Sequence, residues 1–438
     1  MPERFTIDTL LRAFEPVIEQ LPDHRTGRNM TYTLSDAVLS AFAVFFMQLP
    51  SFLAQQQVVQ RQHGRNNAQT LFGVAQIPSD NQIRNLLDPL PPERLFPLFE
   101  TGWQILKATG ALTAFRAFNQ QYLIALDGTQ YFSSHTVHCE ACTHTTSASG
   151  LTTYSHTVLL PMLVAPQQPH AVVLAPEFIT PQDGHDKQDC EHAAAKRWLT
   201  RHGPAFPPQT VTLLGDDLYS HQPFCELALA QQCNFILVCK PDSHATVYKW
   251  VNTLAALGGV SGLTRRQWNG RFGELWTYRY VNDVPLRAET DALHVNWCEL
   301  TITDEHDGRI LYHNAFVTNH PLADDTVEPI VAAGRTRWKV ENEGNNTLKT
   351  KGYHFEHNYG HGQQHLAAFL STLILLAFLC HTLLDLLNTK YQLLRRTLAA
   401  RRTFFDDLRA LTRYWVFDAW DPLFDFMIRG LQLASPPA

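Results

Sequence analysis

The sequence predicts an α/β protein: a mixed sheet flanked by helices, interrupted by an antiparallel β insertion, with helical N- and C-terminal regions. From Tyr122 onward, short apolar runs end in polar residues, a pattern typical of buried strands. Between about residues 274 and 317, apolar and polar residues alternate, as they do in antiparallel strands with one exposed face. The first 115 residues and those after Glu328 follow helical spacing instead.

Composition excludes several classes of protein. The chain has 438 residues, of which 45% are hydrophobic and 17% charged, so it is globular rather than disordered and long enough for several domains. The formal charge of −6 means that a nucleic-acid partner needs a local basic face. Eight cysteines are too few for a disulfide scaffold, and the first residues lack the pattern of a signal peptide, so we expect a cytoplasmic protein.

Residues 1–118 are predicted to be helical. Apolar residues recur at helical spacing from Phe5 to Leu21 and again from Leu34 to Leu49, and Ser79 is a candidate N-cap for a helix that opens at Asp80. Short helices with polar ends suit a DNA-binding region. A helical cap with solvated arginines explains the same pattern equally well.

Residues 119–240, together with 321–387, are predicted to form the α/β sheet and its helices. Four apolar runs are the expected strands, with a helix from about Lys187 to His202 before the fourth. The runs cover residues 122–128, 157–165, 171–179 and 211–219. Residues 241–320 are the β-rich insertion, in which Asp307 and Gly308 predict a hairpin turn.

Residues Leu366 to Leu384 are long and apolar enough to span a bilayer. The segment contains Ser371, Thr372, Cys380 and His381, and the chain on both sides of it has the composition of a soluble protein. We therefore predict a buried core helix. A membrane span and an interfacial or dimerising helix are the alternatives.

Two aspartates end apolar strands of the predicted sheet. Asp127 follows the run that begins at Tyr122, and Asp216 follows the fourth run, so both belong at the rim of the sheet, where a ligand can reach them. Either one alone is also a common turn residue. A third carboxylate, Glu341, lies on a later predicted helix, one turn after Arg337 and one turn before Asn345.

Carboxylates that converge on one point repel each other unless a cation neutralises them, and oxygen ligands favour a hard divalent ion such as Mg²⁺ or Mn²⁺. A pair of such ions activates a water or hydroxyl on one side of a phosphodiester and stabilises the leaving oxygen on the other. Asp127, Asp216 and Glu341 are therefore the candidate metal ligands and catalytic residues.

This order of residues resembles the DDE transposases of bacterial insertion sequences. The likeness covers about Tyr122 to Leu387 and rests on Asp127, Asp216, the β-rich interval and a helical Glu341 preceded by Arg337. It implies a ribonuclease H-like catalytic domain with two Mg²⁺ or Mn²⁺ ions. It also implies hydrolysis and strand transfer at the ends of the element, double-stranded end and target DNA as partners, a homodimer on DNA, and a nucleoid-associated protein.

The family pattern is matched unevenly. The second aspartate is Asp216 or Asp217, and we favour Asp216 because Tyr219 then stands at the family's aromatic position. Arg337 and Glu341 fit the helix signature, but Gly334 stands where the family has tyrosine and Leu348 where it has lysine. Lys349 and Lys351 are the candidate substitutes for that phosphate-binding lysine. An inactive, transposase-derived DNA-binding protein is the alternative function.

Cys139 and Cys142 have the spacing of a zinc half-site, and His138 and His144 stand beside them. These four residues are the candidate ligands of a structural Zn²⁺. A reduced pair without metal and a redox dithiol are the alternatives. At the start of the helix that follows, Asp189 and Glu191 are expected to cap the N-terminus, and Glu191 or His192 could instead support the metal ligands.

Two segments could contact DNA locally. The C-terminal region, residues 388–438, is predicted to be helical and carries Arg395, Arg396, Arg401 and Arg402, a candidate phosphate track. A solvated helix face is the alternative. In the insertion, Trp268 and Arg271 are placed to stack on or contact an unpaired base, although their spacing also fits a plain sheet face.

Overall fold

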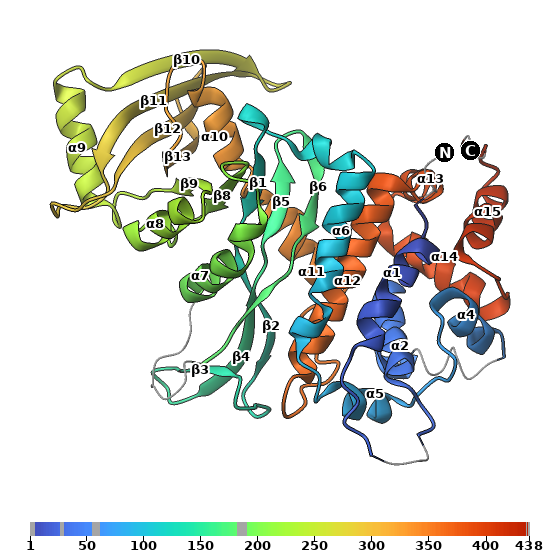
Figure 1. The fold of residues 1–438 in the computed structure, drawn as a ribbon. Coiled ribbons are helices and arrows are strands. Elements are labelled where there is room, and N and C mark those ends of the chain that lie inside the picture. Colours follow the sequence, from blue (N-terminus) through green and yellow to red (C-terminus); the bar gives the residue numbers. More distant parts are fainter. Residues whose placement is uncertain (1–4, 27–29, 55–61, 182–190, 435, 437–438) are drawn as a thin grey trace.

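The protein is a mixed α/β molecule with one large mixed sheet, seen here in a computed structural model that describes residues 5–26, 30–54, 62–181, 191–434 and 436. Nine strands form the sheet, in the order β10-β11-β12-β13-β9-β8-β1-β5-β6. Figure 1 shows the sheet running from the β10–β13 end of the molecule to a helical half that contains both chain termini. The sequence prediction of a mixed sheet with helical ends is confirmed at this level.

The centre of the sheet is built around β1 (Tyr122–Ala125). It pairs antiparallel with β5 (Met162–Ala165), which pairs with β6 (Gln168–Val173). On its other side β1 pairs parallel with β8 (Val211–Gly215), and β8 pairs parallel with β9 (Asn234–Val238). The carboxyl ends of β1, β8 and β9 therefore lie at one edge of the sheet.

Two predicted strands each divide into two. The run at residues 157–165 changes sheet at Pro161, because proline has no N–H to donate to a ladder. Its first half belongs to β4 (Thr152–Leu159), which forms a second sheet with β2, β3 and β7. Pro176 interrupts the run at 171–179 in the same way. The other strands of the second sheet are β2 (Gly128–Ser134), β3 (Thr143–Thr146) and β7 (Glu177–Ile179).

The β2–β3–β4 strands project from the main sheet toward the side where α5 (Asp80–Leu87) lies (Figure 1). Because β2 begins at Gly128, this hairpin starts at the residue that follows Asp127. The position of Asp127 is thus tied to the junction of the two sheets.

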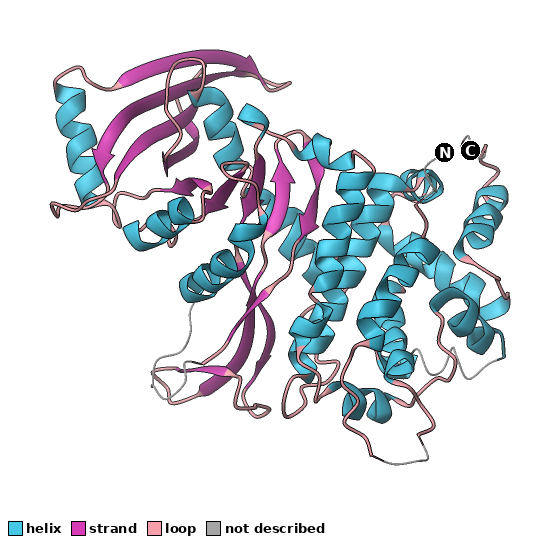
Figure 2. Ribbon diagram, in the orientation of Figure 1, coloured by secondary structure: helices cyan, strands magenta, loops and turns pink. Residues whose placement is uncertain are grey.

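The β insertion extends the main sheet instead of packing beside it. Its last strand pairs antiparallel with β9, with Phe316 opposite Val238. Gly308, at φ 71°, is part of the turn predicted between the last two strands. Figure 2 shows the long strands with helices packed on them. The strands are β10 (Ser261–Trp268), β11 (Gly273–Pro285), β12 (His294–Asp304) and β13 (Ile310–Thr318).

Side chains of the central strands alternate between two cores. Leu123 and Ala125 of β1 point into one core and Ile124 and Leu126 into the other, and all four are fully buried. The second core is covered by α7 (Glu191–His202), α8 (Gln222–Ala230) and α9 (Ala245–Ala256). The first core is covered by the helices of both ends of the chain.

The long apolar helix α12 (Leu366–Leu387) is a core helix. Its mean hydropathy over the most apolar window is 2.2, enough for a membrane span, but 89% of that window is buried inside the protein. It packs against α2 (Leu34–Phe46), α6 (Pro97–Ala108) and β6. The apolar residues of α12 are therefore used for internal packing, as predicted.

The N- and C-terminal helices form one body (Figures 1 and 2). The Asn67 amide donates to the carbonyls of Thr412 and Trp415, and the Trp420 indole donates to the carbonyl of Leu71. The N-terminal helices are α1 (Ile7–Glu19), α2, α4 (Gln62–Phe72), α5 and α6. The C-terminal ones are α13 (Thr389–Thr397), α14 (Arg401–Tyr414) and α15 (Trp420–Gly430).

The prediction of helix throughout residues 328–433 is wrong for residues 351–365, which form an irregular segment. Gly362 shows the reason: its φ is 70°, and a Cβ there would collide with Leu366 and the Asp88 carboxylate. That carboxylate accepts hydrogen bonds from the backbone N–H groups of residues 363–366, the start of α12.

We expect Asp88→Asn to destabilise the fold by about 1–3 kcal/mol at pH 7, because the anion accepts several N–H groups at a helix N-terminus. Burial raises the pKa of Asp88, but these hydrogen bonds outweigh it and lower the pKa. The contribution is therefore present at neutral pH and is lost as the pH falls through the lowered pKa. Thermal unfolding at pH 7 and at about pH 2.5, below the ordinary aspartate pKa, should show the gap between variant and wild type shrinking at the lower pH. An equal gap at both would contradict this account.

Candidate active site

Asp127 and Asp216 leave adjacent parallel strands at equivalent positions. The register pairs Ala125 of β1 with Leu214 of β8, and each aspartate stands two residues further along its strand. The Leu126 N–H donates to the Leu214 carbonyl at 2.9 Å, which extends the pairing toward the aspartates. The structure therefore brings these two predicted residues to the same edge of the sheet.

Asp217, the neighbouring candidate, turns away from this edge. Its carboxylate accepts a 2.6 Å hydrogen bond from the Lys240 N–H and another from the Ser243 hydroxyl, and lies 3.5 Å from His244 Nε2. These contacts hold the loop after β9. Asp216 accepts from the Leu218 N–H and is the aspartate whose charge acts on Asp127.

Glu341 lies on a π-helical segment, Val340–Asn345, between α10 (Val327–Arg335) and α11 (Asn346–Thr350). Arg337 connects it to the sheet: its guanidinium is 2.9 Å from the Glu341 carboxylate and 3.7 Å from that of Asp127. Asn345 donates to Asp127 Oδ2 at 2.7 Å. Short π-helical segments of this kind are frequent at functional sites.

Two contacts hold this helix against the β5–β6 hairpin. The buried Lys339 ammonium donates to the carbonyls of Ala165, Pro166 and Gln168 at 2.6–3.1 Å. Gly344 lies so close to Met162 of β5 that a Cβ would be only 2.5 Å from its sulfur. The lysine and the glycine thereby position Glu341 and Asn345 over the end of β1.

Glu191, at the start of α7, is a fourth acid at this edge. Its carboxylate accepts from the Tyr219 hydroxyl, and Gly128, with no Cβ, leaves room for its approach to the backbone. Burial raises the pKa of Glu191, and the charge of Asp216 adds to this. Of the two residues predicted as possible supports for the metal ligands, Glu191 lies at this edge, whereas His192 packs against Phe224. Asp189 lies outside the described residues.

The cluster carries uncompensated negative charge. Burial, together with the charges of Glu191, Glu341 and Asp216, raises the pKa of Asp127 to about 7, and Arg337 opposes this only in part. Among the described residues, the buried Asn345 Oδ1 has no hydrogen-bond partner. An acidic cluster beside an unused buried acceptor fits a hard, hydrated cation such as Mg²⁺.

Four sulfur and nitrogen atoms form a second cluster, made by Cys139, Cys142, His156 and His361, all within 4.8 Å of one another. This cluster could bind a metal ion such as zinc. The prediction of His138 and His144 as ligands is wrong: both pack their rings against Tyr154, at centroid distances of 4.3 and 6.3 Å.

The two histidines that replace them are distant in sequence. His156 stands opposite Phe132 in the β2–β4 ladder, and His361 lies in the irregular segment before α12. No local spacing rule reaches a ligand 219 positions from its cysteine. His156 stands one residue before the predicted run at 157–165 and is not among the candidate ligands that the sequence indicates.

The basic side chains predicted to contact DNA divide into two groups. Arg401 donates to the Tyr353 hydroxyl and stacks on its ring, and Arg395 donates to the Leu398 carbonyl and lies over Phe404. Arg395 is thus engaged within the C-terminal helices, and Arg401 is engaged with the irregular segment before α12. Arg396 is exposed, and the Arg402 side chain is 91% exposed.

The remaining candidates lie nearer the sheet. Lys349 pairs with Glu356 at 2.8 Å, whereas Lys351 is exposed. Trp268 is 70% exposed at the end of the edge strand β10, and Arg271 is exposed in the turn that follows.

A groove of about 630 Å³ opens between β11, the β5–β6 turn and the helix that carries Glu341. Arg335 lies on its wall with its guanidinium between the rings of Trp276 and Tyr312, at 4.8 and 4.6 Å from their centroids. Trp338, also on the wall, is 47% exposed. Flat rings next to a cation are suited to a nucleic-acid ligand.

No protein-family model matches this sequence, and no curated protein matches it. Among solved structures, the chain is similar to a piggyBac transposase in a synaptic complex with hairpin DNA. The identity is 8% and the TM-score 0.40, over 98% of this chain and 80% of that one. So low a TM-score carries no inference about activity.

Proposed function

We propose that this protein is a DNA transposase that catalyses metal-dependent phosphodiester hydrolysis and strand transfer at the ends of an insertion sequence, with a ribonuclease H-like core. The observation that carries the proposal is the acidic cluster of Asp127, Asp216 and Glu341 at the carboxyl edge of two parallel strands. Its place at a strand edge with a β-rich interval before Glu341 is the arrangement that the sequence resemblance implied.

Asp127, Asp216 and Glu341 would hold two Mg²⁺ or Mn²⁺ ions. When bound, the ions supply the Lewis acid that activates a water or 3′-hydroxyl and stabilises the leaving oxygen. Arg337 holds Glu341 and Asp127 in one cluster, and Asn345 orients the Asp127 carboxylate. Glu191, oriented by Tyr219, adds negative charge at the same edge and strengthens cation binding.

Double-stranded DNA, as transposon ends and target, is the proposed partner, bound by a homodimer. The groove with Arg335 and Trp338 on its wall, formed in part by the helical region that carries Glu341, is the proposed path of the DNA. Arg396, Arg402 and Lys351 are exposed and suited to phosphate, whereas Arg395 and Arg401 are already engaged within the fold.

The test is nicking of DNA that carries the genomic sequence flanking the coding region, with Mg²⁺ or Mn²⁺. We expect the wild type to nick it and Glu341→Gln and Asp127→Asn to lose at least about 100-fold in rate, because each amide keeps the shape and removes the ligand charge. Asp242→Asn, a change at an exposed carboxylate outside the cluster, should retain activity. Nicking that survives both cluster variants would contradict the proposal.

A second candidate function is DNA binding without turnover by a transposase descendant. One observation favours it: the positions of the family's tyrosine and lysine are Gly334 and Leu348, and both are buried. A side chain at 334 would collide with Ile236 and Phe316, so no phosphate contact can arise there. Specific binding of the flanking DNA by folded wild-type protein, with no nicking in either metal, would select this function.

A further inference from the structure

We infer that Cys139, Cys142, His156 and His361 bind one structural Zn²⁺ that joins the β2–β4 hairpin to the segment before α12. This site is separate from the acidic cluster and does not depend on the proposed transposase activity. It is argued from the spacing of the four ligand atoms, from the groups around them and from the two parts of the chain that they connect.

The four atoms have the spacing of a tetrahedral Cys₂His₂ site. Zinc bonds of about 2.3 Å to sulfur and about 2.0–2.1 Å to nitrogen place two sulfurs about 3.8 Å apart, sulfur and nitrogen about 3.5 Å, and two nitrogens about 3.3 Å. The sulfurs are 3.9 Å apart, and the two histidine Nε2 atoms 3.2 Å. The sulfur–nitrogen distances that join Cys142 to both histidines are 3.4 and 3.3 Å.

The donor set selects a borderline-soft ion and closes the site. Two sulfurs and two imidazole nitrogens match zinc, whereas Mg²⁺ and Ca²⁺ require oxygen ligands. Cys142, His156 and His361 are buried and Cys139 is half-buried. Four protein ligands leave no open position for a substrate, which is the arrangement of a structural metal and not of a catalytic one.

Groups around the cluster orient the histidines. His361 Nδ1 lies 3.1 Å from the Gly362 carbonyl, so the N–H belongs on Nδ1 and the lone pair of Nε2 faces the cysteines. The ring of His156 stacks on Tyr131 at 5.5 Å, and that of His361 packs on Phe132 at 4.4 Å. The hydrogen bond from the second ring nitrogen of His361 is the kind of contact usual for metal-ligating histidines.

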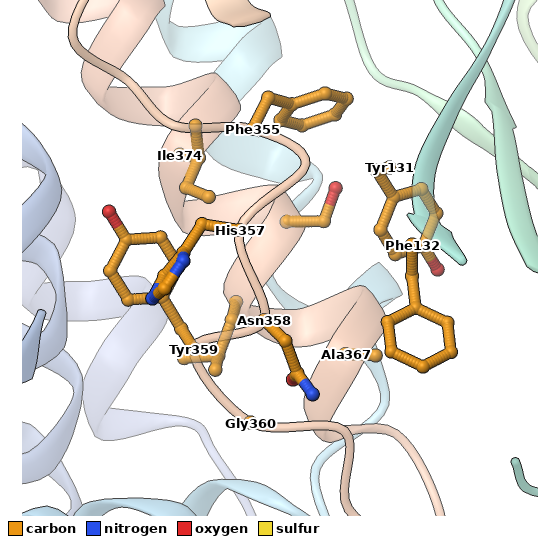
Figure 3. A pocket seen from close by; sticks show the side chains of 11 residues that line it. Tyr131, Phe132, Phe355, His357, Asn358, Tyr359, Gly360, Ala367 and Ile374 are labelled. Carbon is orange, nitrogen blue, oxygen red and sulfur yellow. The ribbon is translucent and has the colours of Figure 1, made fainter. Parts of the chain in front are cut away.

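The proposed metal links two segments that also pack directly against each other, through the rings of Tyr131 and Phe355. Figure 3 shows Tyr131 and Phe132 facing the 355–360 segment and α12 across a cavity of about 20 Å³. On one side the hairpin begins at the residue after Asp127, and on the other His361 follows the helix of Glu341. A bond between residues 219 positions apart restricts the unfolded chain strongly and fixes both segments in the folded one.

The experiment is metal analysis of the purified full chain by mass spectrometry, with thermal unfolding before and after treatment with a strong zinc chelator. We expect about one zinc per chain, and a fall in Tm of about 5 °C or more on its removal that added Zn²⁺ reverses. Cys142→Ser and His361→Ala should each lose most of the zinc. His138→Ala and His144→Ala, changes at histidines next to the same cysteines but outside the cluster, should keep it.

A second measurement covers ligand variants that fail to fold. Wild-type chain stripped of metal and titrated with Co²⁺ should show the visible d–d bands of tetrahedral coordination and a thiolate charge-transfer band, saturating at one equivalent. The inference is overturned if folded wild type contains no zinc and binds neither Zn²⁺ nor Co²⁺. Loss of zinc from the His138 and His144 variants, with retention in the His361 variant, would overturn it equally.

Discussion

Asp216→Asn is expected to lower metal-dependent nicking by about 1,000-fold or more, whereas Asp217→Asn keeps the rate within about tenfold of wild type. The two aspartates are adjacent in sequence, and each variant removes one negative charge. Asp217→Asn is therefore the control for expression level and for the loss of local charge in Asp216→Asn. The two carboxylates point to different neighbours. The charge of Asp216 acts on Asp127 and Glu191, whereas the Asp217 carboxylate faces the loop after β9.

Asp217→Asn should instead affect stability. Its carboxylate accepts from the Lys240 N–H and the Ser243 hydroxyl, and an amide can keep only part of that pattern. We expect a loss of about 1–2 kcal/mol, seen as a lower Tm with nearly unchanged nicking below that temperature. Rates measured at several temperatures separate the two effects. If Asp217→Asn abolished nicking in folded protein and Asp216→Asn did not, the assignment of the second acid would be reversed.

The acids could be predicted from sequence because a short rule governs them. A buried strand becomes polar where it reaches the edge of the sheet, and parallel strands end at the same edge. The positions of Asp127 and Asp216 could therefore be predicted from the ends of two apolar runs. Arg337 and Glu341 follow from the one-turn spacing of a helix. Helical spacing cannot predict that Lys339 anchors this helix, because its hydrogen-bond acceptors are carbonyls more than 170 positions earlier in the sequence.

The metal ligands show the same limit more sharply. Cys139 and Cys142 lie on one turn and could be recognised from their spacing, but the other two ligands come from a strand and an irregular segment that only the fold brings together. Nearby histidines were the natural candidates in a chain with 21 of them, and their rings are used for packing on Tyr154 instead. His361 could be assigned only once the irregular segment before α12 was known to meet the hairpin.

Charge counting misjudged the C-terminal helices for a related reason. A run of arginines predicts a basic surface. In the structure, however, Arg401 contacts the ring and hydroxyl of Tyr353. Arg409 donates to the carbonyls of Met47 and Gln48. Long basic side chains can bury their aliphatic part and donate their N–H groups to backbone carbonyls. Only the exposed members of such a run are available to a phosphate backbone.

The second large effect concerns stability at the acidic cluster: Asp127→Asn is expected to abolish nicking and yet stabilise the metal-free fold at pH 8 by about 2–4 kcal/mol. The pKa of Asp127 is raised to about 7 by burial and by the surrounding acids, above the value of about 3.9 in an unfolded chain. Between these two values the folded state holds a proton that the unfolded state has lost, so stability falls as the pH rises through this window. The cost is complete above pH 7.

Asparagine at position 127 removes the charge and can still accept the hydrogen bond from Asn345. The Tm difference between Asp127→Asn and wild type, measured in buffer free of Mg²⁺ and Mn²⁺, should be small near pH 4.5 and grow to its full value by pH 8. Adding Mg²⁺ at pH 8 should raise the Tm of the wild type and narrow the difference, because the cation favours the ionised carboxylate. Asp242→Asn, at an exposed carboxylate, should show neither trend. A Tm difference independent of pH would mean that ionising Asp127 does not destabilise the fold. It would also contradict the proposal that these carboxylates form a cation site.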